Sequence, residues 1–197
     1  MSNKTAPTIL LASASSRRFD LLRQINIVPE PVLAADIDET PLHGELPQNL
    51  AKRLSQGKAA AFRDQYPDHF ILAADTVVAC GKNILDKAEN AEQAAVFLKK
   101  LSGRRHHVHG GITLITPDGR QLTRHCRTLV QFKPLSDREI EDYIASKEWE
   151  GKAGGYAIQG TAAAFVKYLA GSYSNVVGLS LYDTMKILDS GGFKTAP

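Results

Sequence analysis

The segment from residue 70 to residue 80 most constrains what this chain can fold into. It is apolar except for Asp75 and Thr76, and it is followed by Gly81-Lys82-Asn83 and a second short apolar piece, Ile84-Leu85. This pattern predicts a buried strand that enters a hairpin. An ionised carboxylate is costly to bury unless it is paired, hydrogen-bonded or bound to a metal. Asp75 is therefore a candidate functional residue, although it could merely cap or bend the strand where it leaves the sheet.

Further strands and helices surround this segment in a mixed order. Residues 8–12 predict a strand that runs through a tight loop into a helix over residues 17–25. Long strands are expected near 105–116 and 121–133, joined by a Pro117-Asp118-Gly119 turn. Because βα units and hairpins occur in one chain, we expect an α/β fold with a mixed β-sheet flanked by helices, not a purely parallel doubly wound sheet.

The remaining elements follow from capping and turn residues. Pro47 suits the first turn of a helix that reaches about Tyr66. Asn90-x-x-Gln93 and Ser136-x-x-Glu139 have the spacing of capping boxes, which predicts a helix after each. Residues 151–160 are too rich in glycine for a regular element, and a strand and a helix are expected to close the chain. With 197 residues and 43% hydrophobic content, the whole chain is predicted to form a single domain.

Composition excludes several classes of function. The 24 basic and 21 acidic residues nearly balance and are scattered, which argues against a general nucleic-acid binder. Cys80 and Cys126 lie far apart without metal-ligand spacing, and the first residues do not resemble a signal peptide, so we expect a cytoplasmic protein. The apolar runs are far shorter than the roughly 20 residues that cross a bilayer, so no membrane role is expected.

The loop between the first strand and helix is a candidate anion site. It contains the small residues of Ser13-Ala14-Ser15-Ser16, followed by Arg17 and Arg18. Small residues let the backbone approach an anion, and free N–H groups at the start of a helix point toward it. Arginines at this end of a helix oppose the helix dipole unless an anion is bound there. The alternative is a serine-capped surface helix whose arginines extend into water.

Acidic and basic side chains elsewhere could complete a phosphate site. Asp36, Asp38 and Glu39 lie in a predicted loop and could add an oxygen ligand for Mg²⁺, which takes one or two carboxylates besides phosphates and water. Lys58 falls near the apolar face of its helix and Lys87 follows the hairpin, so both could direct positive charge into a cleft. Solvated acids and surface lysines are the plainer interpretation of each residue alone.

Two further features admit more than one interpretation. Gln159 lies in the glycine-rich loop, where its amide could read a nucleobase or could instead be buried in a structural bend. His107 and His109 would share one face of a strand, which together with His106 invites a metal site, but this interpretation is the less favoured one.

Taken together, the motifs resemble the Maf family of nucleotide pyrophosphatases. Residues 11–22 read LASASSRRFDLL, similar to the segment that opens Maf chains. Ordered matches at many places make chance similarity improbable, and they cover essentially the whole chain. The other matching segments are Ala74-Asp75-Thr76, Ile84-Leu85-Asp86-Lys87, Leu101-Ser102-Gly103 with His106 and Val108, residues 152–160, and residues 171–179.

The resemblance implies a nucleoside triphosphate pyrophosphatase that releases pyrophosphate from its substrate. It further implies two lobes around a nucleotide cleft, similar to inosine triphosphate pyrophosphatases, a divalent cation such as Mg²⁺ or Mn²⁺, and a homodimer. Arg17, Thr76 and Gln159 match the branch that acts on dTTP and UTP. The branch associated with 7-methyl-GTP has Trp in place of Arg17. The chain departs from the family pattern at Ser16, Asp86, Ala88, Gly110 and Ser180.

The mechanism expected from these residues places a metal between substrate phosphates and the carboxylates of Asp75, Glu39 and Asp86. Asp86 is one methylene shorter than the family's Glu, so we expect a water between it and the metal. Water activated by Asp75 as proton acceptor, or by the metal, would attack the α-phosphorus. One alternative function is a nucleotide-binding regulator of septum formation, and another is a nucleotidyltransferase. Residues expected to bind substrate are Ser13, Arg17, Arg18, Lys58, Thr76, Lys87 and Gln159.

Overall fold

A seven-stranded mixed sheet organises the molecule. The computed structural model describes residues 8–194, and the strand order is β2-β1-β3-β5-β6-β7, with β4 paired to β3 outside this path. β1 pairs in parallel with β2 and β3, whereas the other neighbours are antiparallel. The predicted mixed sheet is confirmed. The strands are β1 (Ile9–Ala12), β2 (Val32–Leu33), β3 (Phe70–Cys80), β4 (Asn83–Leu85), β5 (Arg105–Ile115), β6 (Gln121–Phe132) and β7 (Val166–Ala170).

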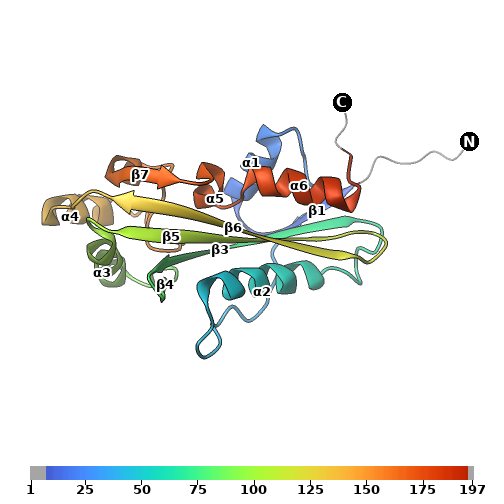
Figure 1. Ribbon diagram of the computed structural model, residues 1–197, viewed down its shortest axis with the longest axis horizontal. Helices are drawn as coiled ribbons and strands as arrows, with labels where there is room; N and C mark the ends of the chain where they lie inside the picture. Colours follow the sequence, from blue (N-terminus) through green and yellow to red (C-terminus); the bar gives the residue numbers. More distant parts are fainter. Residues whose placement is uncertain (1–7, 195–197) are drawn as a thin grey trace, which may run out of the picture.

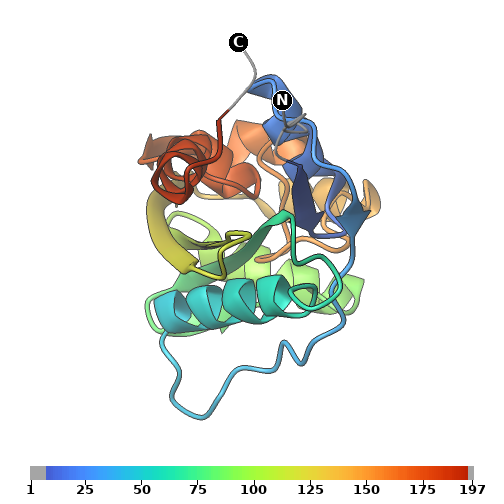
Figure 2. The same cartoon turned by 90° about the vertical axis from the view of Figure 1, so that its right-hand side faces the viewer.

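Helices cover both faces of this sheet. In Figures 1 and 2, α2 lies along one face, and α1, α5 and α6 lie on the opposite side. A strand covered on both faces is apolar at nearly every position, which explains why β3 is a continuous apolar run. The helices are α1 (Ser16–Gln24), α2 (Pro47–Ala60), α3 (Ala91–Leu101), α4 (Asp137–Ala145), α5 (Tyr173–Val177) and α6 (Leu181–Gly191), with a short 3₁₀ helix at Thr161–Phe165.

The two predicted capping boxes have different outcomes. Ser136 and Glu139 form the complete reciprocal box that starts α4. At the start of α3, the Asn90 side chain accepts a hydrogen bond from the Gln93 backbone N–H at 2.9 Å. The Gln93 side chain, however, accepts from the backbone of Glu89, one residue before the position that a capping box requires.

Two boundaries differ from the predictions. α2 ends at Ala60, and the segment to residue 65 continues as turns, so the helix is shorter than the expected 47–66. At the carboxyl end of the chain there are two helices where one was expected. Gly178 separates them with a φ of 148°, a conformation that side chains oppose. Ser172 caps α5 and Ser180 caps α6, so the Ser at position 180 has a clear structural role.

A helix approaches the sheet very closely at Gly111. A Cβ atom there would lie 2.0 Å from the Ala51 carbonyl oxygen, so α2 can rest on β5 only because residue 111 has no side chain. This contact brings α2 down onto the sheet, and with it Lys58 toward Asp75 of β3. Within residues 8–194, no helix is both long and apolar enough to cross a membrane.

Candidate functional site

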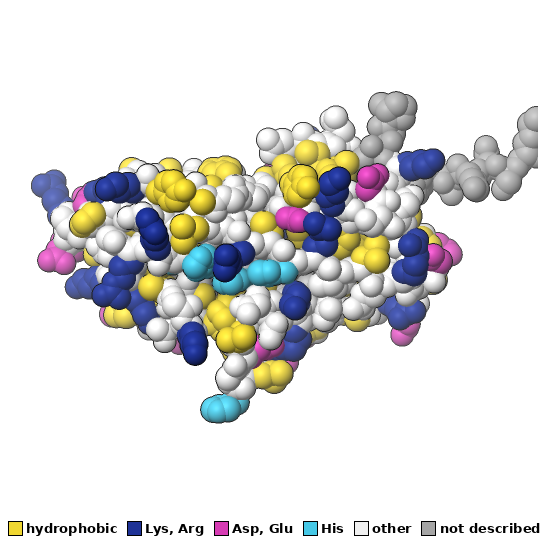
Figure 3. All heavy atoms as spheres, viewed as in Figure 1, with side chains coloured by type: hydrophobic (Ala, Val, Ile, Leu, Met, Phe, Trp, Pro, Cys, Tyr) yellow, Lys and Arg dark blue, Asp and Glu magenta, His cyan; other side chains and the backbone are white. Residues whose placement is uncertain are grey.

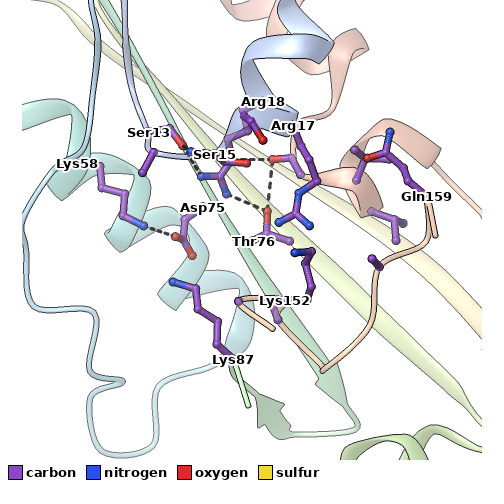
Figure 4. Close-up of a pocket in the computed structure, with 18 of the residues that line it drawn as sticks. Ser13, Ser15, Arg17, Arg18, Lys58, Asp75, Thr76, Lys87, Lys152 and Gln159 are labelled. Atoms are coloured by element: carbon purple, nitrogen blue, oxygen red, sulfur yellow. Dashed lines mark hydrogen bonds and ion pairs between the residues drawn. The ribbon is translucent and has the colours of Figure 1, made fainter. Parts of the chain in front are cut away.

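A cavity of about 430 Å³ opens beside the carboxyl end of β1. Its walls come from segments throughout the chain, and the predicted phosphate loop is one of them. Figure 4 shows side chains from β3, α1, α2 and the glycine-rich loop directed toward this space. Nine of the ten predicted site residues line it. The lining comprises residues 12–18, 34–35, 39, 58, 75–76, 87, 151–153, 156–159 and 176–178.

Two carboxylates and a lysine form a charged cluster in the cavity. Lys58 Nζ from α2 lies 2.6 Å from Asp75 Oδ1 and 2.7 Å from Glu39 Oε1. The side chains of Lys58 and Asp75 are only 10% and 9% exposed. Lys87 Nζ lies 3.5 Å from the other oxygen of Glu39. The buried Asp75 is therefore paired, as the cost of burying a charge requires.

Glu39 is held in its ionised form by the two lysines. Partial burial alone would raise the pKa of this carboxyl group. The hydrogen bond and charge of Lys58, followed by those of Lys87, outweigh burial, so the pKa of Glu39 lies below its usual value. The cavity thus presents an ionised Glu39 beside Lys58 at neutral pH.

Arg18 is bonded mainly within the protein. Its guanidinium donates to Ser13 Oγ at 2.9 Å, to Thr76 Oγ1 at 3.2 Å and to the Gly178 carbonyl at 3.0 Å (Figure 4). The fork geometry of arginine makes three such contacts possible at once. Burial lowers the pKa of Arg18, and the charge of Asp75 opposes that shift. Arg18 therefore joins three segments of the cavity wall.

The three residues that resemble the dTTP/UTP branch line the same cavity. Thr76 donates to the Gly178 carbonyl at 3.3 Å and accepts from Arg18, so its hydroxyl group is fixed. Arg17 is partly buried, and burial lowers the pKa of its guanidinium. Gln159 is exposed at the rim of the cavity. Figure 4 places Arg17 between Thr76 and Gln159. Their roles in substrate selection remain predictions.

Asp86 is the predicted site residue that does not line the cavity. It is exposed, and its Oδ1 accepts a hydrogen bond from the Lys87 backbone N–H at 2.7 Å. Across residues 8–194 there is no group of three or more His, Cys, Asp or Glu side chains that could hold a metal. The expected set of Glu39, Asp75 and Asp86 is therefore not assembled. Asp86 lies outside the cavity lining that contains the other two carboxylates.

The histidines of β5 divide between the two faces of the sheet. His106 is buried and shares a 2.8 Å hydrogen bond with the Tyr156 hydroxyl. His109 lies on the other face, where its Nδ1 is 3.0 Å from Nε2 of His125 and the two rings stack. Figure 3 shows histidine side chains gathered on this face over β5 and β6. His107 and His109 do share a face, as predicted, but the three histidines of β5 do not converge.

Lys152 is a cavity residue that sequence reasoning did not select. It lies in the glycine-rich loop beside Ala153, which pairs with Lys87 in an isolated bridge. The sequence feature that could have identified it is its place directly before Ala153-Gly154-Gly155, but by sequence alone a single lysine in a loop is indistinguishable from a surface residue. With it, five cationic and two carboxylate side chains line the cavity, an excess that favours an anionic ligand. The cations are Arg17, Arg18, Lys58, Lys87 and Lys152.

Comparison with known proteins gives consistent relatives. The model of the family described as "Maf-like protein" matches residues 8–191. The chain is similar to the "dTTP/UTP pyrophosphatase" of Paramagnetospirillum magneticum, with 58% identity over 94% of this chain and 97% of that protein. It is also similar to the protein of the same name from Caulobacter vibrioides, with 52% identity over 95% of this chain and 97% of that protein.

Solved structures give a more distant match. One is a nucleoside-triphosphatase, "dITP/XTP pyrophosphatase", from Mycobacterium abscessus, with a TM-score of 0.42 and 17% identity over 64% of this chain and 72% of that chain. Another is the Ham1 protein of Staphylococcus aureus, with a TM-score of 0.43 and 17% identity over 64% and 71%.

Proposed function

Because this chain belongs to the Maf family, we propose that it hydrolyses nucleoside triphosphates, with dTTP and UTP preferred, to the monophosphate and pyrophosphate. Relatives that match this chain over nearly their whole length carry the name dTTP/UTP pyrophosphatase, which supports this substrate class. Modified pyrimidine nucleotides belong to the same class, and their removal would keep the nucleotide pool clean.

The observation that carries the proposal is a buried carboxylate inside a cationic cavity. Asp75 is 7% exposed and faces a space lined by five positively charged side chains. The cations match a triphosphate, and the carboxylate supplies an acceptor for the proton of an attacking water. A binding module for nucleotides would need the cations but would have no use for the buried acid.

Each group has a defined task in this mechanism. Asp75 accepts the proton of the water that attacks the α-phosphorus, and pyrophosphate leaves on the opposite side. Lys58 holds Asp75 and Glu39 in one place through contacts of 2.6 and 2.7 Å. Lys87 and Arg17 offset the charge of the phosphates. Arg18 fixes Ser13 and Thr76, which shape the wall against which the nucleotide lies.

The donor set fits a divalent cation that shares its coordination with the substrate. Glu39 and Asp75 lie close together because both contact Lys58 Nζ, and Mg²⁺ usually takes one or two carboxylates plus phosphate and water oxygens. Bound beside these carboxylates, Mg²⁺ or Mn²⁺ would polarise phosphate oxygens and lower the pKa of a coordinated water. Glu39 and Asp75 would hold it, and Asp86 would contribute only through a water or after a loop movement.

Replacing the proton acceptor tests the proposed activity. We expect Asp75→Asn to lower kcat for UTP and dTTP by at least a hundredfold, because it keeps the shape of the side chain while removing its charge and basicity. Pyrophosphate release over a panel of triphosphates is the measurement. Asp142→Asn, at an exposed position of α4, is the matched control and should retain full activity. Undiminished release by Asp75→Asn would refute the assignment.

Removal of divalent cations tests the proposed cofactor. We expect dialysis against a chelator to abolish pyrophosphate release, because a divalent cation beside Glu39 and Asp75 would polarise the phosphate and activate the attacking water. Titration with Mg²⁺ and with Mn²⁺ should restore it. Full turnover in the chelator would leave only cationic side chains of the protein to offset the phosphate charge and would contradict a metal role.

Three further expectations accompany this function. A cytoplasmic enzyme acting on free nucleotides needs neither a membrane nor a nucleic acid as partner. A homodimer is expected from the family, and sedimentation equilibrium would test it. A role as a regulator of septum formation would be favoured only if the purified protein bound nucleotide without turnover.

A further inference from the structure

Three of the five cavity cations, Arg17, Arg18 and Lys152, have no carboxylate partner in the part of the chain that the structure describes. Lys58 and Lys87 both contact Glu39. Arg18 donates hydrogen bonds to the hydroxyl groups of Ser13 and Thr76 and to the Gly178 carbonyl. Neither Arg17 nor Lys152 occurs in any ion pair between residues 8 and 194. Their charges are therefore available to a ligand.

The backbone around Lys152 is fixed by its neighbours. The Gly154 N–H donates to the Leu85 carbonyl at 2.9 Å, which ties the loop to β4. Gly154 has a φ of 74°, and a Cβ there would lie 2.8 Å from a side-chain atom of Val78, so this turn requires glycine. The Lys152 ammonium donates to the Glu150 carbonyl at 3.0 Å and keeps its other two N–H groups.

The loop places Lys152 opposite Arg17. Figure 4 shows both side chains extending into the same space, between Thr76 and Gln159. Burial lowers the pKa of Lys152, and the charge of Arg17 lowers it further. Of the acids that attract Lys152, Glu148 is engaged with the Thr161 backbone N–H at 2.8 Å. Two facing cations repel each other unless oxygen atoms with negative charge lie between them.

We propose that Lys152 is a substrate-binding residue, and that Lys152 and Arg17 form a two-cation subsite for acceptor oxygens of the bound nucleotide. Both groups are donors only, so the subsite accepts oxygen atoms and rejects amino groups. Those oxygens come either from the triphosphate or from the carbonyl groups of a uracil or thymine ring. The inference rests on the proposed pyrophosphatase activity and adds a binding residue to it.

Kinetics of Lys152→Met with UTP and CTP test the proposal. Loss of one charge-assisted hydrogen bond predicts a rise in KM for UTP of about tenfold, with kcat changed less. Lys152→Arg keeps a charged donor and should stay within about threefold of wild type. Lys167→Met, an exposed position on β7 outside the cavity, is the matched control. Melting temperatures of all variants show that each one is folded.

The second nucleotide identifies the source of the oxygens. Cytosine carries an amino group where uracil carries a carbonyl oxygen. A rise in KM for both UTP and CTP supports a triphosphate contact, and a rise for UTP alone supports a carbonyl contact. A KM within twofold of wild type for both nucleotides would overturn the proposal, as would a folded Lys152→Arg variant as impaired as Lys152→Met.

A double-mutant cycle tests whether the two cations share one ligand group. If they do, the effects of Arg17→Met and Lys152→Met on kcat/KM are not multiplicative, and the double variant departs from their product by at least threefold. Strict multiplicativity would contradict a shared subsite. A wild-type protein that releases no pyrophosphate from any triphosphate would instead refute the proposed function, so the two failures are distinguishable.

Discussion

Arg18 lines the cavity, as its sequence context suggests, and it also joins segments of the cavity wall. Both arginines of the loop are expected to contact phosphate, and three of the five N–H groups of Arg18 already bond to Ser13, Thr76 and Gly178. Its neighbour Arg17 extends into the cavity without a carboxylate partner (Figure 4). Adjacent residues of one helix point in different directions, about 100° apart. Arg18 can therefore bond to the cavity wall while Arg17 extends into the cavity.

A conservative substitution distinguishes a structural arginine from a simple positive charge. We expect Arg18→Lys to lower kcat/KM for UTP by at least tenfold and to destabilise the fold by about 2 kcal/mol, because one ammonium group cannot replace the three-way fork. Steady-state kinetics and urea unfolding provide the two readouts. Arg23→Lys, an exposed arginine of the same helix, is the control. An Arg18→Lys variant with wild-type values in both would show that only the charge matters.

Two departures from the family pattern have a local explanation. The absence of a side chain at Gly110 leaves room for Asn175, whose Oδ1 would lie 2.0 Å from a Cβ there. Asn175 is buried and donates to the Val108 carbonyl and to Thr128 Oγ1, both at 3.1 Å. Ser180 caps α6 where the family commonly has proline. Neither change disturbs the acid and lysine group of the cavity.

At the scale of elements, the packing of α2 on β5 determines whether Lys58 reaches Asp75. We expect Gly111→Ala to destabilise the fold by about 3 kcal/mol and to reduce activity, because the new methyl group would collide with the backbone of Ala51. Gly57→Ala in α2 is the matched control. Its methyl group meets only the flexible end of Ile37, at 3.1 Å, and alanine favours the helix by about 1 kcal/mol.

Urea unfolding and pyrophosphate release of these two glycine variants provide the measurement. Equal destabilisation by both substitutions would mean that α2 can shift away from the sheet, and that the close contact does not position Lys58.

Long strands and capped helices could be predicted from the sequence because their signals are local. The apolar run of β3 and the Pro117–Gly119 turn each occupy one stretch of chain, and the structure confirms both. The carboxyl-terminal helices were harder, since the break at Gly178 depends on a φ of 148° that serine-rich neighbours do not reveal. Candidate site residues could be predicted where a charged residue lies within an apolar segment, as Asp75 does in residues 70–80.

The remainder of the site depends on distant contacts. Arg18 donates to Gly178, 160 positions later in the chain, and no local pattern predicts this bond. Lys152 reaches the cavity because Gly154 bonds to β4, which again joins separate parts of the chain. Asp86 was a plausible ligand from its neighbours, yet its hydrogen bond to the Lys87 backbone holds it outside the cavity lining.

At the scale of the whole molecule, buried histidines make stability depend on pH. Burial, and to a lesser extent the charge of His107, lowers the pKa of His106 from 6.5 to about 4. Between these two values the unfolded chain binds a proton that the folded chain does not, so stability is complete above pH 6.5 and is lost as the pH falls toward 4. His109, whose pKa is also lowered to about 4, acts in the same direction.

Urea unfolding at pH 7 and pH 5 provides the measurement. We expect His106 to remove about 2 kcal/mol of stability between these two values. His106→Gln should therefore be less sensitive to acid than the wild type by this amount, while its amide can still bond to Tyr156. An identical pH dependence of the two proteins would contradict the assignment.

The proposal of one domain over residues 1–197 is supported by the sheet itself. Its strands begin at Ile9 and end at Ala170, and β1 pairs with β3 although α1, β2 and α2 intervene in the sequence. A single cooperative unfolding transition by two spectroscopic probes would agree with one domain.

The distribution of the cavity lining has a consequence for how substrate and fold depend on each other. Residues from position 12 to position 178 contact one space, so any opening that detaches a wall segment also destroys the binding site. A nucleotide bound there must be released before such an opening can occur. Binding therefore raises the free energy of unfolding, by about 2.7 kcal/mol when the free nucleotide is at a hundred times its Kd. In a cell, the supply of substrate would therefore set how long each copy of this chain resists proteolysis.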